Sequence, residues 1–477
     1  MVRRLPRTAH QPKPIRIMSQ RKRQHRKTTR TAAAHSPLQT VIHPDAAGID
    51  VGATELVCAV PAGRGPGPHV LTFSAFTAGL HELRDWLVAC DIKTVAMEST
   101  GNYWLCACLL LEDAGIEVCL VNARHITGVP GKKTDVCDAA WLQQLHAAGL
   151  LRGSFRPEKE ILPLRYLMRH RGDLLHQAAE QVLLMQKVLT EMNLHIHHVF
   201  SDVDGESAQR IITAILGGER DAAKLAALRD PRCRASLAKV LAALKGDFRP
   251  EYLFVLRQCQ ERWQQLGRSL TECDAVIARQ TAAVSGVTDA PLPAAPATQR
   301  RVHKNMPQTM PVYAEAYRLF GVDLSAVPGV SGGVLCTLLS ELGTAVHLRE
   351  KFRSAEAFAS WLGLCPDNRI SGGRILKART RKVANRIATI LRLAANSLSR
   401  AKGPMGDYVR RFKGRLGKAE GIVAGAHKLA RIIWAMIVSG EAYDESKAFA
   451  VSASTTARRL KNLQHQAQAL NMKLVPV

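Results

Sequence analysis

The chain has 477 residues, of which 47% are hydrophobic and 22% are charged, so it can bury substantial cores, and its length predicts two to four domains. Its 66 lysines and arginines outnumber its 40 acidic residues, which gives a formal net charge of +26. This excess predicts a polyanionic partner, nucleic acid above all. We find no uninterrupted apolar stretch of about 18 residues and no secretory signal, so we expect a cytosolic protein that does not enter a membrane.

Basic residues are already frequent in the N-terminal segment. Residues 1–40 contain eleven Lys or Arg and no acid, which predicts a disordered arm that contacts phosphates without reading sequence. A dispensable, solubilising extension explains the same composition equally well.

Residues 46 to about 150 alternate between strand-like and helix-like patterns. Three strands joined by short turns and then strand–helix alternation predict a mixed sheet flanked by helices. Residues 122–133 contain Gly128, Pro130 and Gly131, which indicates a loop. The expected strands cover 46–52, 54–60, 69–76, 93–98 and 116–122, and the expected helices cover 79–90, 103–113 and 136–149.

Four carboxylates in this region form the most informative pattern. Asp50 and Glu98 end short apolar strand-like runs, and Asp135 and Asp138 lie three residues apart, on one face of a helix. Together they suit Mg²⁺, and two such ions roughly 3.5–4 Å apart could support phosphodiester cleavage. Each acid also has a plainer explanation: a turn after a strand for Asp50, a helix cap for Glu98, and a favourable helix-dipole position for Asp135 with Asp138 as its exposed neighbour.

Beyond Pro163 the chain becomes helical. Met168, Leu175, Val182, Leu189 and Ile196 recur every seven residues, and a second heptad pattern runs from Leu256 to Ile277. Two such helices can pair with each other or with another subunit. Shorter helices are expected over 201–250, and residues 281–311, rich in Ala, Thr and Pro, look like a linker.

Cysteines and histidines give weaker signals. The eleven cysteines contain no Cys-x-x-Cys pair, so reduced thiols are expected rather than a zinc site or a disulfide framework. His195, His197 and His198 have a spacing that could bind a metal from a helix, but polar residues at a helix end are the commoner explanation.

Two features of the last third suggest phosphate contacts. Residues 324–342, with Gly329 and Gly332, resemble a helix–hairpin–helix whose backbone N–H groups can meet a phosphate, although a plain packing turn explains the pattern too. Residues 369–431 carry seventeen Lys or Arg and two acids. On apparently helical segments this density predicts a nucleic-acid surface, against the alternative of a merely solvated basic face.

From about 46 to 440 the chain resembles the DEDD transposases of the insertion-sequence one-ten family, the bridge-RNA-guided recombinases. The matching segments are 47–51 (AGIDV), 98–104 (ESTGNYW), 132–139 (KKTDVCDA), 327–330 (VPGV), 362–366 (LGLCP) and 371–374 (SGGR).

The resemblance implies an α/β fold followed by helices: a ribonuclease-H-like, RuvC-like domain, long coiled-coil helices and a mainly helical C-terminal transposase domain. It implies Asp50, Glu98, Asp135 and Asp138 as Mg²⁺ ligands and Ser371 as a nucleophile in a composite site formed by both domains, across subunits. It further implies DNA and a noncoding bridge RNA as partners and a homo-oligomer, a dimer or a tetramer. The expected parts are an arm (1–40), the RuvC-like domain (41–160), a coiled-coil domain (161–283), a linker (284–315), the transposase domain (316–445) and a tail (446–477).

Ser371 is a weak nucleophile on its own and needs help from a base or a metal. Two glycines follow it, and basic residues nearby could neutralise developing charge on a phosphate. A Ser-Gly-Gly turn without chemistry is the plainer explanation, and Ser331-Gly332-Gly333 is a rival for the role. The residues expected to contact nucleic acid are Lys132, Lys133, Gly329, Gly332, Arg374, Lys377, Arg379, Arg381 and Lys382.

Three other functions fit parts of the sequence. A structure-specific nuclease or junction resolvase would use the same acids without a serine. An actin-like ATPase or sugar kinase would share the phosphate-loop-like run at 50–54, but the heptads stand where its second phosphate loop belongs. A non-catalytic nucleic-acid-binding protein would keep the basic surface but has no use for four acids.

Overall fold

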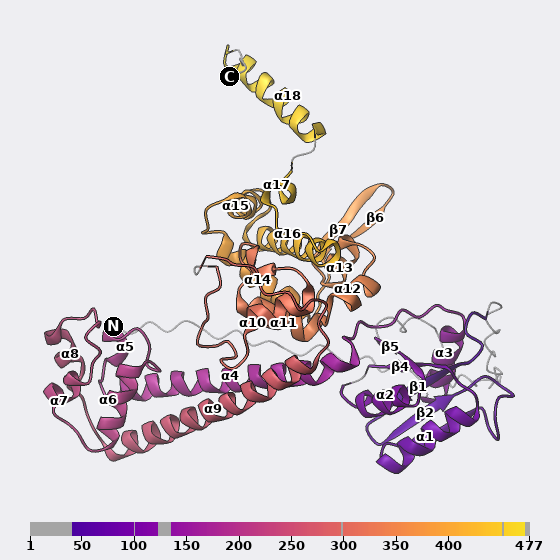
Figure 1. Cartoon of the computed structure of the whole chain (residues 1–477), viewed down its shortest axis with the longest axis horizontal. Helices are drawn as coiled ribbons and strands as arrows, with labels where there is room; N and C mark the ends of the chain where they lie inside the picture. The colour runs from indigo at the N-terminus through magenta and orange to yellow at the C-terminus, as the bar shows by residue number, and fades with distance from the viewer. Residues whose placement is uncertain (1–40, 100, 123–134, 297–298, 451–452, 473–477) are drawn as a thin grey trace, which may run out of the picture. The chain divides into compact units, whose positions relative to one another are not determined.

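The computed structural model describes residues 41–99, 101–122, 135–296, 299–450 and 453–472. The chain divides into two compact units, residues 1–154 and 155–477 (Figure 1). The segments expected to form the basic arm (1–40) and the loop with Lys132 and Lys133 lie outside the described residues.

Unit 1 is built on a five-stranded mixed sheet with the order β3-β2-β1-β4-β5. The first three strands along the chain pair antiparallel, and β1 pairs parallel to β4 and β4 parallel to β5. All eight elements expected from the sequence form here, with ends within about two residues of the prediction. They are β1 (Ala46–Val51), β2 (Glu55–Ala59), β3 (Val70–Ser74), α1 (Thr77–Ala89), β4 (Thr94–Glu98), α2 (Trp104–Asp113), β5 (Glu117–Val121) and α3 (Asp135–Ala147).

The two faces of this sheet are covered by different helices. Alternate strand residues such as Ile49 and Met97 are fully buried in one cluster with Leu83 of α1 and Leu111 of α2. The opposite face packs against α3, which contacts β1 and β2. This layered arrangement confirms the mixed sheet flanked by helices that the sequence predicts.

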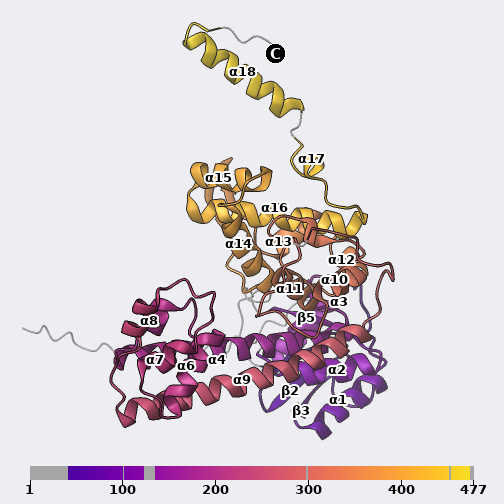
Figure 2. The same cartoon turned by 60° about the vertical axis from the view of Figure 1, so that its left-hand side comes forward.

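Unit 2 contains two long helices, α4 (Leu162–Glu191) and α9 (Pro250–Ala283), which lie side by side in both views (Figures 1 and 2). Of the two pairings that the heptads allow, the chain therefore makes the one within itself. The first heptad run ends earlier than expected, because α4 stops at Glu191 and Asn193 adopts a positive φ of 56°. The connection between α4 and α9 contains four short helices that pack around a separate hydrophobic core. They are α5 (Ile196–Val199), α6 (Glu206–Leu216), α7 (Ala222–Ala227) and α8 (Leu237–Ala243).

A buried ion pair lies between the two long helices. Arg171 of α4 donates to Asp274 of α9 at 2.5 Å, and the two residues are 5% and 3% exposed. The Arg171 guanidinium also donates to the Asn305 carbonyl, and Asp274 accepts from the Gln308 backbone N–H. Because every partner must be in place to compensate the desolvated charges, we expect this pair to favour one register between α4 and α9.

The rest of unit 2 is mainly helical, and its helices between residues 312 and 439 pack around one large core. Residues 284–311 form neither helix nor strand where described, yet Met306 and Met310 are buried in that core. The elements are η2 (Lys159–Ile161), α10 (Val312–Phe320), η3 (Leu324–Ala326), α11 (Gly332–Leu342), α12 (Ala345–Lys351), α13 (Ala355–Trp361), β6 (Pro366–Ser371), β7 (Arg374–Thr380), α14 (Arg386–Leu398), α15 (Pro404–Leu416), α16 (Lys418–Ser439), α17 (Glu445–Ala448) and α18 (Ala453–Ala469).

Two findings differ from the sequence-based expectation for this part. Residues 366–380 form an antiparallel β-hairpin rather than the start of a basic helical run. Helix α16 is long and apolar enough to span a membrane by length and composition. However, it packs against α13, α14 and α15, and half of its apolar stretch is buried. A core helix explains this pattern.

Candidate functional site

Asp50 and Glu98 lie next to each other on neighbouring parallel strands of unit 1. The last paired residues of β1 and β4 are Ile49 and Met97, and the next residue on each strand is an acid. Adjacent strands run about 4.8 Å apart, so the two acids share one row at the end of the sheet. Both are half-buried.

The two acids point to the face of the sheet that α3 covers. Side chains alternate along a strand, and the preceding Ile49 and Met97 are buried on the α1 and α2 side. Val57, which pairs with Asp50 from β2, packs instead against Ala139 of α3.

The direction of α3 brings its first turns toward Asp50. The Gln143 side chain donates to the carbonyl of Ala46, at the start of β1. Two residues further, a Cβ on Gly48 would lie 2.4 Å from the Ala139 carbonyl oxygen. Two more residues advance β1 by about 6.6 Å, equal to about four helical residues, which places Asp50 level with the segment that contains Asp138.

Three of the predicted acids, Asp50, Glu98 and Asp138, therefore come from elements that converge at one end of the sheet. Asp135 is the first residue of α3, but its side chain is not among those described. Carboxylate oxygens suit Mg²⁺, so this donor set fits that ion chemically. Among the described side chains, these acids do not form a group whose ligand oxygens all lie within 4.8 Å, whereas His195, His197 and His198 bring ring nitrogens within that distance.

Ser371 ends β6 at the tip of the hairpin in unit 2. It pairs with Arg374 of β7, and only Gly372 and Gly373 lie between them. Their φ angles of +54° and +74° are those of a tight two-residue turn that favours glycine. Both Ser371 and Arg374 are exposed, so the turn presents Ser371 to solvent, opposite Arg374 in the strand pairing.

The other basic residues of this region have different surroundings. Arg379 lies opposite Asp367 in the strand register of the hairpin, and Lys382 is exposed beyond β7. Arg381 donates to the Ser360 carbonyl, so it also ties the base of the hairpin to α13. Lys377 lies on β7, and its side chain is not described.

The predicted hairpin glycines are tightly packed by protein. A Cβ on Gly329 would lie 2.7 Å from a Leu398 methyl carbon, and a Cβ on Gly332 would lie 2.1 Å from the Met306 methyl carbon. Packing therefore explains both glycines without a ligand. A cavity of 390 Å³ lies on the same segment, lined by Gly329, Ser331 and Arg301.

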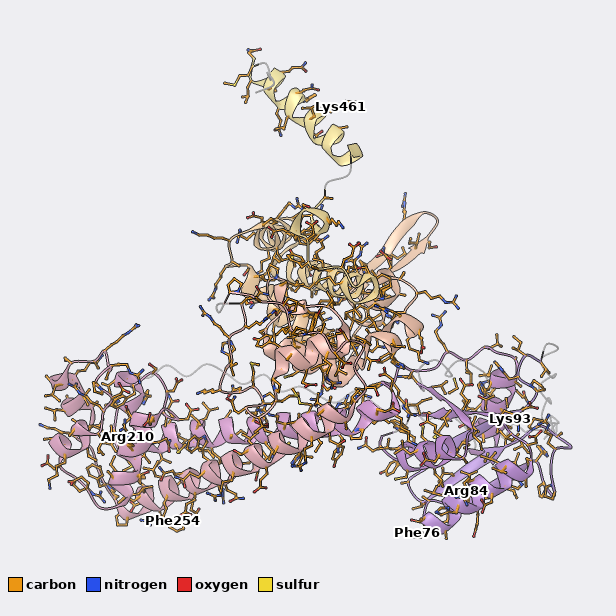
Figure 3. The ribbon with its side chains drawn as sticks, in the orientation of Figure 1. Phe76, Arg84, Lys93, Arg210, Phe254 and Lys461 are labelled. Atoms are coloured by element: carbon orange, nitrogen blue, oxygen red, sulfur yellow. The ribbon has the colours of Figure 1, made fainter. Side chains whose placement is uncertain are left out.

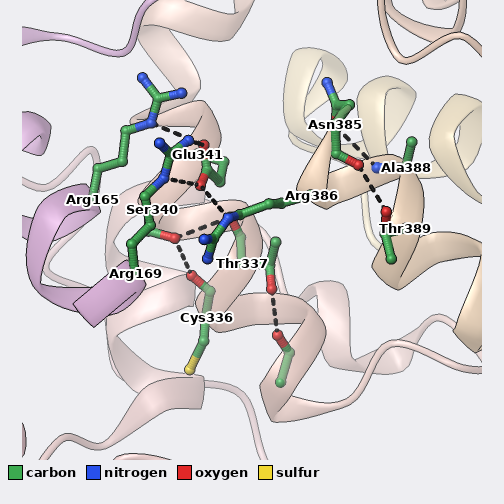
Figure 4. A network of polar contacts seen from close by, with 11 residues as sticks. Arg165, Arg169, Cys336, Thr337, Ser340, Glu341, Asn385, Arg386, Ala388 and Thr389 are labelled. Carbon is green, nitrogen blue, oxygen red and sulfur yellow. Dashed lines mark hydrogen bonds and ion pairs between the residues drawn. The ribbon is translucent and has the colours of Figure 1, made fainter. Parts of the chain in front are cut away.

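An arginine cluster that the sequence did not predict lies around Glu341 of α11 (Figure 4). Arg165 and Arg169 of α4 donate to this carboxylate at 2.9 Å. Arg386 of α14 lies 3.9 Å from it, and the Glu341 side chain is only 8% exposed. Burial lowers the pKa of Arg165, and the Glu341 charge opposes that effect. Three cations face one anion beside a cavity of 720 Å³, which leaves an excess of positive charge for an anionic group.

Two family models match the chain. The DEDD_Tnp_IS110 model, described as a transposase, matches residues 47–194. The second, described as transposase IS116/IS110/IS902 family, matches residues 323–410. The chain belongs to the DEDD transposases of the IS110 family. No curated protein matches it.

Membership defines the chemistry in outline. A transposase of this family cleaves and recombines DNA, so DNA is its substrate. The DEDD domain implies use of a divalent metal ion, typically Mg²⁺. The first match contains Asp50, Glu98, Asp135 and Asp138, and the second contains Ser371.

Sequence reasoning did not single out Arg165, Arg169 and Glu341. One signal was present: Glu341 is the only charged residue in the apolar helix α11. A lone acid at a buried position needs a partner. The partners come from α4, more than 170 positions earlier in the chain, so the sequence alone gave no means of naming them.

Proposed function

We propose that this transposase cuts and rejoins DNA strands for a bacterial insertion sequence, using its acidic set together with Ser371. The observation that carries the proposal is the position of Asp50 and Glu98, side by side after the Ile49–Met97 pair, on the face that the first turns of α3 approach. A family match that includes both acids supports the same assignment.

Asp50, Glu98, Asp135 and Asp138 would hold Mg²⁺, as two ions. When bound, Mg²⁺ would neutralise charge on the phosphate and help to activate the attacking oxygen. The acids supply the negative charge and oxygen donors that such an ion requires, and the sheet end keeps Asp50 and Glu98 in one row.

Ser371 provides the attacking oxygen in this proposal. Its Oγ forms a bond to phosphorus and gives up its proton, while the phosphorus–deoxyribose oxygen bond breaks and that oxygen leaves as a hydroxyl. The strand is then held as a phosphoserine ester, and attack by a deoxyribose hydroxyl restores the serine and rejoins DNA. Exposure of Ser371 at a tight turn beside Arg374 suits this role, because little side-chain bulk blocks a phosphate there.

Basic groups outside the reacting centre would bind the nucleic-acid backbone. The predicted residues Lys132, Lys133, Gly329, Gly332, Arg374, Lys377, Arg379, Arg381 and Lys382 belong to this proposal. We add the cluster of Arg165, Arg169 and Arg386, since its excess charge beside a cavity suits a phosphate.

The partners in this proposal are element ends and target DNA, a bridge RNA that pairs with both, and further copies of the chain in a dimer or tetramer. A net charge of +26 is consistent with binding so much polyanion. The protein would work on the bacterial nucleoid.

Trapping of a covalent intermediate tests the serine chemistry. Labelled element DNA and Mg²⁺ should give a protein–DNA adduct with the unaltered transposase and with the control variant Ser331→Ala. Ser331 is the N-cap residue of α11. Ser371→Ala should form no adduct and no recombinant product, while binding of DNA is retained. Full cleavage by Ser371→Ala would instead favour a nuclease that uses the acids without a serine.

A further inference from the structure

Three histidines gather in the connection after α4. His195, His197 and His198 each offer one ring nitrogen, and these atoms all lie within 4.8 Å of one another. Their ring centroids are 4.2 to 6.2 Å apart. All three lie between the two ranges that the family models match, 47–194 and 323–410.

The backbone that carries them is held by the surrounding core. The His195 N–H donates to the Ala243 carbonyl at the end of α8, and the His198 N–H donates to the His195 carbonyl, both at 2.9 Å. Ile196 and Val199 of the same turn are buried in the core of this connection. Helix α5 packs against α8 (Figure 1), so the backbone that carries the three rings is held in place by one packing contact.

Hydrogen bonding leaves one ring nitrogen of His195, Nδ1, available as a ligand. Its Nε2 lies 2.9 Å from Oδ1 of Asn193, and an amide oxygen only accepts, so Nε2 carries the proton and Nδ1 carries the lone pair. The Nδ1 atoms of His195 and His197 are buried, with no hydrogen-bond partner in the described part of the chain. Buried polar atoms without partners are rare in native proteins, and a bound cation would satisfy both.

We propose that His195, His197 and His198 bind one borderline transition-metal ion, of the Zn²⁺, Co²⁺ or Ni²⁺ class, with Asn193 orienting His195. Neutral imidazoles suit these ions and not Mg²⁺, which prefers oxygen. A hydrogen bond from the second ring nitrogen to an oxygen acceptor is the usual support of a metal-bound histidine. Three protein ligands leave a fourth coordination position for water. The His198 ring is exposed, so it can rotate until its nitrogen becomes the third protein ligand.

Binding by the full-length, untagged chain tests the site. Calorimetric titration with Zn²⁺, and the visible spectrum with Co²⁺, should show one ion per chain that Mg²⁺ does not displace. His195→Ala and His197→Ala should weaken binding by at least about tenfold. His176→Ala, an exposed histidine on α4 paired with Glu180, should not. Asp50→Asn should also leave the affinity of the histidine site for Zn²⁺ and Co²⁺ unchanged, which separates this site from the carboxylates of unit 1.

Asn193→Gly tests the orienting role. Glycine accepts the positive φ of 56° at this position and removes only the acceptor, so affinity should fall by about tenfold to a hundredfold. X-ray absorption of the Co²⁺-loaded, unaltered protein gives an independent readout that needs no variant. Equal binding by His197→Ala, or an absorption spectrum without imidazole scattering, would overturn the proposal.

Discussion

Gly48 illustrates how one residue controls the position of the acids. A Cβ there would lie 2.3 Å from the Gln143 nitrogen and 2.4 Å from the Ala139 oxygen. Both atoms belong to the backbone of α3, so a methyl group forces the helix away from β1. We expect Gly48→Ala to cost about 1–3 kcal/mol of stability and to reduce Mg²⁺-dependent cleavage, because α3 carries Asp138. Thermal unfolding and a cleavage assay measure the two effects.

Gly267→Ala is the matched control. Gly267 lies within α9, and a Cβ there meets no atom within 4 Å. This change should stabilise the protein by about 0.5–1 kcal/mol and leave cleavage unaltered. Equal behaviour of the two variants would contradict the close approach of α3 to β1.

His146 predicts a pH dependence for unit 1. Burial, with a smaller contribution from the charge of His43, lowers the pKa of His146 from 6.5 to about 4. Between pH 6.5 and about 4, the unfolded chain therefore binds a proton at this histidine that the folded chain does not bind. The contribution of His146 to stability is complete above pH 6.5 and is lost as the pH falls toward 4. The loss should reach at most about 3 kcal/mol.

His146→Gln removes the titrating group and can still bond to Thr94, whose hydroxyl lies 2.8 Å from His146 Nε2. Melting temperatures measured across this pH range should fall less steeply for the variant than for the unaltered protein. Parallel curves would exclude His146 as the source of the pH dependence.

The sequence could predict that Asp50 and Glu98 lie on neighbouring strands of one sheet, but it could not predict the surroundings of the other sites. Asp50 and Glu98 follow apolar strand-like runs, and neighbouring parallel strands end at one edge of a sheet. The cluster at Glu341 depends on contacts between α4, α11 and α14, and no local pattern encodes that meeting. Likewise, the spacing of His195, His197 and His198 is visible in the sequence, but the buried nitrogens and the Asn193 bond are not.

At the scale of elements, strong periodicity was the reliable guide. Alternating and apolar runs located each strand in the described part of unit 1, and the heptads located α4 and α9. The hairpin over 366–380 was missed because its strands are polar and basic, with little of the β-branched content that favours strands. Its turn signal, two glycines after Ser371, predicts a turn, but nothing in the flanking residues indicates that they pair as strands.

The ion pair between Arg171 and Asp274 should govern the pairing of α4 with α9. Arg171→Met leaves a buried carboxylate without its cation, which should cost about 3–5 kcal/mol. The double variant Arg171→Met with Asp274→Leu removes both charges and should recover most of that loss. Hydrogen exchange of peptides from α4 and α9 measures the change.

An exposed ion pair gives the comparison. Arg232 and Asp230 lie in the connection between α7 and α8, and the Arg232 side chain is 90% exposed. Arg232→Met should change protection little. A double variant at Arg171 and Asp274 as unstable as the single one would show that the pair does more than compensate its own burial.

For the whole molecule, charge is the dominant property. Side chains such as Arg84 and Lys93 in unit 1 and Arg210 in unit 2 lie on the surface (Figure 3). With a net charge of +26, affinity for DNA should fall steeply as salt rises, because each neutralised phosphate releases counterions.

Salt dependence also tests the arginine cluster at Glu341. If Arg169 contacts a phosphate, Arg169→Gln should make the slope of log K against log salt less steep by about 0.9. Arg268→Gln is the control, since Arg268 lies on α9 and bonds only to Gln265 in the described contacts. An unchanged slope in Arg169→Gln would remove the cluster from the nucleic-acid surface.

Cleavage of element DNA as Mg²⁺ is titrated tests the central claim most directly. Asp50→Asn, Glu98→Gln and Asp138→Asn should each abolish Mg²⁺-dependent strand cleavage while DNA binding and folding persist. Asp85→Asn, an acid on α1 whose side chain is 67% exposed, should cleave normally. Full cleavage by Asp50→Asn or Glu98→Gln at ordinary Mg²⁺ concentrations would contradict the account.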